Sequence, residues 1–218
     1  MIKPPFDVRP GTLHKTKNYG TLIVKEYVSR KNVVVQFVKT GFITPSRSNY
    51  VREGVVRDML HPIVYGVGFT GVGCYSASRD KKVYKTWCGM LERCYSEKSL
   101  KKRPTYVGCS VASEWHNFQN FTAWFYENYP TDNKVYDLDK DIKVSGNKVY
   151  CPDACLFVSH EDNVVKASAK HYTFNSPDGE TVDVYNLNGF CRLNNLNHGH
   201  MGAVNSGKRN HHKGWTKV

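Results

Sequence analysis

The sequence predicts an α+β fold in which small β-sheets and short helices follow one another along 218 residues. Three observations indicate this class: β-prone runs bounded by turn residues, two segments with helical spacing of apolar residues, and a change of pattern after Pro130. A hydrophobic content of 40% and a charged content of 23% are typical of folded proteins. We expect three parts, namely a small β-rich unit over 1–65, a core over 66–170 and a C-terminal module over 171–218.

Positive charge is the first indication of a partner. The formal net charge is +12, and cations cluster within 81–103 and 208–217. Lysines and arginines that contact phosphates release counterions, so such charge favours nucleic acid over small neutral ligands. A merely solvated basic surface is the alternative.

The chain also indicates where it works. No segment approaches the roughly 20 apolar residues that span a bilayer. Residues 1–5 lack the apolar region of a secretory signal. We therefore expect a cytosolic protein without membrane contact, whose seven cysteines are thiols or metal ligands rather than disulfides.

The first half of the chain contains a hairpin and a glycine-rich connection. Two β-prone runs over 21–38 flank turn residues Ser29–Asn32, which predicts an antiparallel hairpin. Residues 66–73 contain four glycines but lack the Gly-Lys-Ser/Thr ending of a phosphate-binding loop. We interpret them as a linker or tight turn.

Two amphipathic helices follow. Apolar residues at i, i+3, i+4 and i+7 predict the first over 84–95, and Ser113 is expected to cap a second that ends near Asn128. The residues expected to be buried in the first are Trp87, Met90, Leu91 and Cys94. Those of the second are Trp115, Phe118, Phe121, Thr122 and Phe125, which we expect to form core rather than base-stacking platforms.

After Pro130 the predicted order is strand, loop, strand and helix, over 135–139, 145–147, 155–158 and 161–170. The C-terminal part begins with a hairpin over 172–185, because Asp178-Gly179 is a strong turn signal.

Two short helices over 187–194 and 197–206, the second stopped by Gly207, complete the outline of a helix-turn-helix. Its expected small core comprises Leu193, Leu196, Met201 and Val204.

Several short motifs resemble phage HNH-family homing endonucleases. Residues 138–141 (Leu-Asp-Lys-Asp), residues 152–159 and Asn163 are similar to the ββα-metal core of HNH nucleases. Residues 84–95, with Glu114, Trp115 and Phe118, resemble its lead-in. The resemblance covers roughly residues 60–165. It implies a site-selective DNA endonuclease in the cytoplasm of a bacterial host cell.

The resemblance also implies a catalytic site. Asp139 and Asn163 would hold a single divalent cation, Mg²⁺ or Mn²⁺, which suits carboxylate and amide oxygens. Lys140 stands where the family keeps its general-base histidine, and flanking acids are expected to raise its pKa. Three alternatives remain open: Lys140 positions the phosphate, His160 is the base, or the site is inactive. A simple charged strand end at 139–141 is the competing interpretation.

The cysteines allow one further metal. Cys94, Cys109, Cys151 and Cys155 are candidates for a structural Zn²⁺ site, but only Cys151 and Cys155 have ligand spacing. We therefore expect buried thiols.

Residues 186–215 resemble the modular helix-turn-helix repeat appended to homing endonucleases, which implies double-stranded DNA as the partner. Asparagines and histidines suit base edges, and basic residues suit phosphates. The residues expected to contact DNA are Asn197, His198, His200, Asn205, Lys208, Arg209, His211, His212 and Lys213.

Other interpretations of this segment and of the whole chain remain open. The segment is alternatively a structural subdomain with a charged tail, or a histidine metal site. For the whole chain the alternatives are a non-catalytic DNA-binding protein derived from an HNH nuclease, and an RNA-binding protein. The oligomeric state is not indicated, and a monomer is the default expectation.

Overall fold

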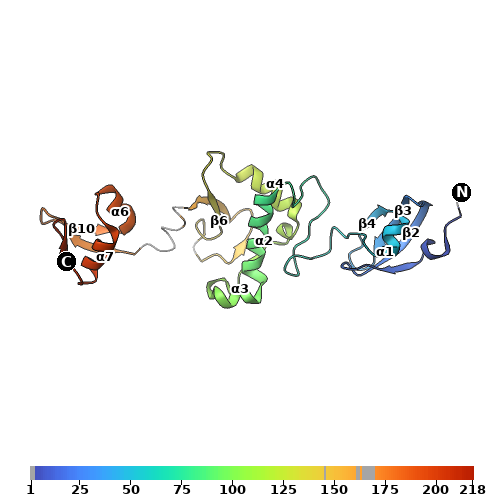
Figure 1. Ribbon diagram of the computed structural model, residues 1–218, viewed down its shortest axis with the longest axis horizontal. Helices are drawn as coiled ribbons and strands as arrows, with labels where there is room; N and C mark the ends of the chain where they lie inside the picture. Colours follow the sequence, from blue (N-terminus) through green and yellow to red (C-terminus); the bar gives the residue numbers. More distant parts are fainter. Residues whose placement is uncertain (1–2, 145, 161–162, 164–169) are drawn as a thin grey trace. The chain divides into compact units, whose positions relative to one another are not determined.

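The computed structural model describes residues 3–144, 146–160, 163 and 170–218. Within them, helices alternate with four small sheets (Figure 1), so the α+β class is confirmed. Contacts divide the chain into two compact units, the first formed by Met1–Tyr129 with Lys140–Leu156 and the second by Pro130–Asp139 with Phe157–Val218. The stretch expected to form the central core thus contributes to both units.

The N-terminal residues form an antiparallel meander of four strands in chain order. The predicted hairpin over 21–38 is confirmed, because the second and third strands pair around the turn at residues 30–31. The elements are η1 (Phe6–Val8), β1 (Leu13–Lys15), β2 (Thr21–Ser29), β3 (Asn32–Phe37), β4 (Ile43–Ser46) and α1 (Ser48–Glu53). The core consists of Val8, Leu22, Val24, Val33, Val35, Phe37, Val51 and Val56.

Alternation along these strands gives the sheet a core face and an outer face. The row Leu13, Ile23, Gln36 and Ile43 crosses all four strands on the outer face. The β2–β3 register shifts twice, between Val24 and Glu26 and between Tyr27 and Ser29. The edge strand β4 contains Pro45, which has no N–H to donate to a further strand.

A second core of the same unit is built on aromatic residues of two helices. The predicted helix over 84–95 is confirmed and starts slightly earlier, and its four expected core residues are buried. The buried Trp87 indole N–H donates to the Trp115 carbonyl oxygen at 2.7 Å. The elements are α2 (Lys81–Tyr95), α3 (Glu97–Lys102), η2 (Pro104–Tyr106), β5 (Ser110–Val111), η3 (Ser113–His116), α4 (Phe118–Asn128) and β7 (Val149–Tyr150).

The prediction for the start of the second helix is wrong. Ser113 begins the 3₁₀ turn η3, and α4 begins at Phe118. Asn117 caps α4, because its side-chain oxygen accepts the backbone N–H of Gln119 at 3.0 Å. The expected core role of the aromatic residues is confirmed: Trp115, Phe118, Phe121, Thr122 and Phe125 are all buried.

The glycine-rich stretch serves packing. Val64 and Gly68 form an isolated antiparallel bridge around a turn. A Cβ on Gly68 would lie 2.5 Å from Leu91 and 2.9 Å from Trp87. The interpretation of a tight turn is confirmed, and glycine is required here because α2 lies so close to the backbone.

Both strands predicted after Pro130 are confirmed, and they pair with each other as β6 (Tyr136–Asp139) and β8 (Leu156–Ser159). The parallel pairing of β7 with β5 was not expected. The helix predicted over 161–170 lies outside the described residues, apart from Asn163 and Lys170. His160 and Asn163 both have helical backbone.

The C-terminal module contains the predicted hairpin and both predicted helices. Its sheet has the order β10-β9-β12-β11. The elements are β9 (Tyr172–Asn175), β10 (Thr181–Val184), α6 (Leu187–Leu193), α7 (His198–Asn205), β11 (His211–His212) and β12 (Trp215–Lys217). The core consists of Phe174, Val184, Leu187, Cys191, Met201 and Val204.

One core residue of this module was wrongly predicted. Leu193 is 88% exposed, because Leu187 and Cys191 share the buried face of α6 and Leu193 lies on another. No helix in the described part of the chain is long and apolar enough to cross a membrane.

Replacing Gly54 with alanine is expected to destabilise the N-terminal sheet. Gly54 has φ 66°, and a Cβ there would lie 2.8 Å from the Lys15 carbonyl oxygen. The left-handed backbone costs alanine about 1–2 kcal/mol, and the contact adds about 1–3 kcal/mol. Gly11→Ala is the matched control, since Gly11 has φ 93° and no neighbour within 4 Å. Urea unfolding measures both variants, and equal losses would contradict the close approach.

Candidate functional site

Asp137, on β6, binds two side chains that follow β8. Its Oδ2 is 2.7 Å from His160 Nδ1 and accepts a hydrogen bond from Asn163 Nδ2 at 3.0 Å. The backbone N–H of His160 donates to the Val135 carbonyl oxygen at 3.0 Å, which ties this residue to the start of β6. His160 and Asn163 are three residues apart, so both project from one helical face towards the strand.

The shared acceptor determines what the two side chains can offer. A carboxylate only accepts hydrogen bonds, so His160 Nδ1 carries a proton and Nε2 is the basic nitrogen of the neutral ring. Likewise, the Asn163 amide turns its nitrogen to Asp137 and leaves Oδ1 as an acceptor. The side chains of His160 and Asp137 are 63% and 36% exposed, so a substrate can reach them.

Asp139 lies two residues after Asp137 on the same strand. Side chains two residues apart project from one face of a strand, so both acids share a face of β6. Sequence reasoning identified Asp139, His160 and Asn163 but missed Asp137. The signal was available in the i, i+2 spacing of the two acids within a predicted strand.

The donor chemistry suits a hard divalent cation. Mg²⁺ binds proteins through one or two carboxylates and completes its shell with water or substrate oxygens. Asp137, Asp139 and the Asn163 amide oxygen are ligands of this chemical kind. Among the described residues, no group of three or more His, Cys, Asp and Glu side chains could hold a metal. A site of this kind therefore depends on the amide oxygen as well as on carboxylates.

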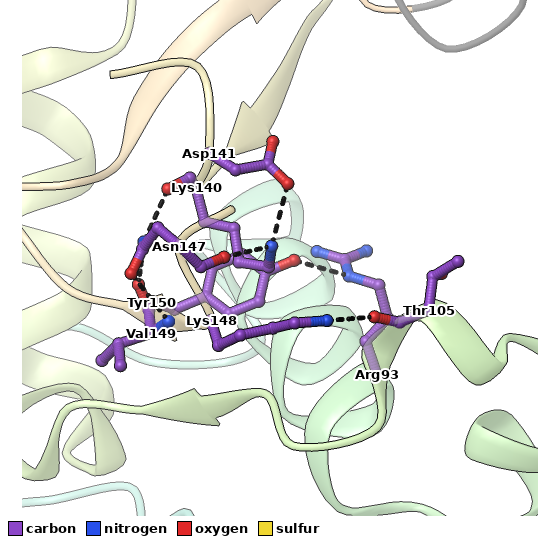
Figure 2. A network of polar contacts seen from close by, with 8 residues as sticks. All are labelled: Arg93, Thr105, Lys140, Asp141, Asn147, Lys148, Val149 and Tyr150. Atoms are coloured by element: carbon purple, nitrogen blue, oxygen red, sulfur yellow. Dashed lines mark hydrogen bonds and ion pairs between the residues drawn. The ribbon is translucent and has the colours of Figure 1, made fainter. Parts of the chain in front are cut away.

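Lys140 closes the loop that follows β6 (Figure 2). Its ammonium donates to Asp141 Oδ2 at 3.0 Å and to the Asn147 carbonyl oxygen at 2.8 Å. In the other direction, Asn147 Nδ2 donates to the carbonyl oxygens of Lys140 and Val149, each at 2.7 Å. Lys140 is only 8% exposed, so this lysine is an internal tie, that is, a buried ammonium that links Asp141 to the Asn147 backbone.

The same network continues to α2. The Lys140 ammonium lies 5.9 Å from the centre of the Tyr150 ring, and Arg93 Nε donates to the Tyr150 hydroxyl at 3.2 Å. Lys148 Nζ donates to the Thr105 carbonyl oxygen at 2.8 Å. These contacts connect the loop to the segments around β5.

The charge state of Lys140 follows from this environment. Burial alone would lower its pKa, but the hydrogen bond and charge of Asp141, helped by Cys109 and Tyr106, raise the pKa above its usual value. The direction of this shift agrees with the expectation, and Asp141 is the flanking acid that causes it. Lys140 therefore stays protonated at neutral pH and is a poor proton acceptor.

All seven cysteines are thiols in the structure. Burial, with a smaller contribution from neighbouring Cys109, raises the pKa of Cys94 to about 11. Cys94, Cys109, Cys151 and Cys155, the four candidates for zinc, do not gather into a ligand set in the described chain. Cys94, Cys109 and Cys155 are buried and Cys151 is half-buried, as expected for thiols that pack in a core.

The C-terminal module holds part of its expected DNA-contacting set at the start of α7. Asn197 caps this helix, since its side-chain oxygen accepts the His200 N–H at 3.0 Å. Its backbone N–H donates to His212 Nε2 at 3.1 Å, and the His200 and His212 rings meet edge to face. His212 is buried, and its ring nitrogen accepts the N–H of the residue that caps α7.

The remaining expected residues differ in exposure. Asn205 is half-buried at the end of α7. Arg209 Nε donates to the His211 carbonyl oxygen at 2.8 Å and Lys213 Nζ to that of Asn195 at 2.9 Å. The exposed residues of the set are Asn197, His198, His200, Lys208, Arg209, His211 and Lys213.

No protein-family model, no curated protein and no solved structure matches this chain. Its function is therefore inferred from its own residues and their geometry.

Lys140→Met is expected to lower the free energy of unfolding by about 1.5–3 kcal/mol, the range for hydrogen bonds to charged groups. The Asn147 carbonyl oxygen would lose the ammonium that it accepts from. Lys143→Met is the control, because exposed Lys143 donates to the Asp153 carbonyl oxygen at the surface and its loss should cost about 0.5 kcal/mol or less. Urea unfolding tests the pair, and equal losses would contradict the internal tie.

The pKa of His212 is expected to lie below 6.5. Burial disfavours its charged form, and the nearby positive groups of His200, Arg209 and Lys213 add to this effect. The unfolded chain then binds more protons, so the stabilisation is complete above pH 6.5 and decreases as the pH falls below it. Histidine titration by NMR measures the pKa, and urea unfolding between pH 7.5 and 5 measures the loss. In His212→Gln this loss should be smaller, and a pKa at or above 6.5 would refute the assignment.

Proposed function

We propose that this protein is a site-selective, metal-dependent DNA endonuclease of the HNH type, acting in the cytoplasm of a bacterial host. The observation that carries the proposal is the meeting of Asp137 with His160 and Asn163 beside the paired strands β6 and β8. A carboxylate, an oriented imidazole and an amide oxygen at an accessible site suit metal-assisted phosphodiester hydrolysis.

In this proposal His160 is the general base. Its Nε2 takes the proton of the attacking water as the water oxygen bonds to phosphorus and the bond to the leaving oxygen breaks. Asp137 holds Nδ1–H at 2.7 Å, which fixes the orientation of the ring and stabilises the imidazolium that forms. Lys140, protonated and internally bound, stabilises the loop after β6.

Asp139 and Asn163 would hold the cation, Mg²⁺ or Mn²⁺, through carboxylate and amide oxygens. When bound, the cation neutralises charge on the phosphate and the leaving oxygen. Asp137 assists by accepting the Asn163 amide N–H, which leaves the amide oxygen for the cation.

The C-terminal module would select the target on double-stranded DNA. Asn197, His198 and His200 lie exposed at the start of α7, where side chains can reach base edges. Lys208, Arg209 and Lys213 in the segments after α7 suit phosphates, which position a protein without reading sequence.

A non-catalytic DNA-binding protein derived from such a nuclease is the second candidate. The observation in its favour is Lys140, an internally bound and protonated lysine at the position of the family histidine. The two candidates differ in strand scission and agree in DNA binding.

His160→Gln is expected to slow plasmid nicking in Mg²⁺ or Mn²⁺ at least 100-fold, because general-base catalysis contributes about 10²–10⁴-fold. Asp137→Asn should also reduce nicking, since the amide no longer holds the imidazole as a charged acceptor. Asp132→Asn is the control: the partners of this exposed acid among the described residues are nearby Tyr136 and Lys134, so its loss should leave nicking unchanged.

DNA binding measured in EDTA should be equal for all three variants and the wild type. Nicking by His160→Gln at the wild-type rate would refute the assigned base. A wild type that binds DNA but nicks none with either metal would favour the non-catalytic candidate.

A further inference from the structure

Positive charge is concentrated in the N-terminal sheet rather than in the C-terminal module. Residues 1–60 contain 11 of the 31 lysines and arginines but only four of the 19 acids. They therefore carry +7 of the total +12, whereas residues 171–218 contain five cations and three acids. This excess of seven positive charges lies outside the residues assigned to the metal site and to the helix-turn-helix.

Half of the acids in residues 1–60 already have partners within the sheet's own unit. Asp7 forms an ion pair with Arg52 at 2.5 Å. Asp58 is buried and accepts the Thr40 hydroxyl at 2.6 Å and the Leu60 N–H at 2.9 Å. The other ten cations are all exposed: Lys3, Arg9, Lys15, Lys17, Lys25, Arg30, Lys31, Lys39, Arg47 and Arg57.

Three of these cations gather at one end of the sheet. Arg30 and Lys31 form the β2–β3 turn, and Arg47 follows the end of β4. Ser48 holds the turn in place, because its N–H and its hydroxyl donate to the Arg30 carbonyl oxygen at 3.0 and 3.2 Å. We call Arg30, Lys31 and Arg47 the cationic tip.

Two hydrogen bonds hold the backbone of the cationic tip, and its positive charge lacks an acidic partner among the described residues. No acid occurs in residues 27–52 of the sequence, and the ion pairs among the described residues include none of the three cations. The Arg47 guanidinium lies 5.8 Å from the centre of the exposed Tyr50 ring, which orients it at the surface. Like charges held together repel one another, and a polyanion relieves that repulsion.

We propose that the cationic tip binds the phosphate backbone of duplex DNA, as a second contact surface besides the C-terminal module. Arginine presents a planar fork that matches phosphate oxygens, and lysine adds a point charge. Such contacts are independent of sequence and set affinity and register. The inference rests on DNA as the partner in the proposed function, but it does not depend on catalysis.

The test compares two triple variants of the full chain by fluorescence anisotropy on a duplex of random sequence in EDTA, over a series of salt concentrations. Arg30→Gln, Lys31→Gln and Arg47→Gln together remove the cationic tip. Lys15→Gln, Lys17→Gln and Lys39→Gln remove the same charge from the opposite end of the sheet, where β2 begins and β3 ends. A third variant, Arg30→Lys with Arg47→Lys, retains the charge.

Each phosphate contact contributes about 0.9 to the slope of log K against log salt, so removing the cationic tip should reduce the slope by about 2–3. The opposite-end variant should reduce it by less than about 1, and the lysine variant should keep it. An unchanged slope, or equal reductions in the two triple variants, would overturn the proposal. Preferential loss of structured RNA binding in the tip variant would overturn duplex DNA as its ligand.

The nicking assay separates this inference from the proposed function. If the wild-type protein nicks DNA but the tip variant keeps the wild-type salt slope, the inference is refuted and the proposed nuclease function stands. A reduced slope together with a wild type that never nicks would refute the nuclease and leave the inference standing. Urea unfolding of each variant verifies that these exposed substitutions leave the fold intact.

Discussion

The loop between β6 and β7 depends on one buried ammonium. Lys140 reaches the Asn147 carbonyl oxygen, and the Asn147 amide returns to the Lys140 carbonyl oxygen, so two residues seven positions apart close the loop from both sides. A charge this poorly exposed is stable only when acceptors replace the lost water. Asp141 and the Asn147 carbonyl oxygen provide these acceptors. Tyr150, after the loop, accepts a hydrogen bond from Arg93 through its hydroxyl.

The candidate catalytic trio of Asp137, His160 and Asn163 differs, because its polar groups are accessible to solvent. His160 is exposed and Asp137 is half-buried, and an ion pair in such an accessible setting contributes about 0–1 kcal/mol to stability. Stability therefore gives little reason for this arrangement, whereas orientation of a proton acceptor does. The chain thus carries one buried polar network that defines local structure and one accessible network that suits chemistry.

The sequence predictions were accurate for elements set by residues close together in the chain, and failed for pairings between distant segments. The β2–β3 and β9–β10 hairpins and α2 were predictable, because turn residues and apolar spacing are local signals. The β5–β7 and β9–β12 pairings join strands of two to four residues that lie about 40 positions apart, which leaves no periodic trace. The i, i+2 spacing of Asp137 and Asp139 placed both acids on one face of a predicted strand, but the partners of Asp137 are defined only when β6 lies beside His160.

The edges of the N-terminal sheet bear on how this protein stays dispersed at high concentration. The outer face exposes Leu13 and Ile43, and open sheets with such faces tend to stack or add strands. Three features oppose that growth: β1 has three residues, β4 contains Pro45, and the β2–β3 register shifts twice. An edge blunted in this way disfavours amyloid-like association while it leaves the charged turns accessible.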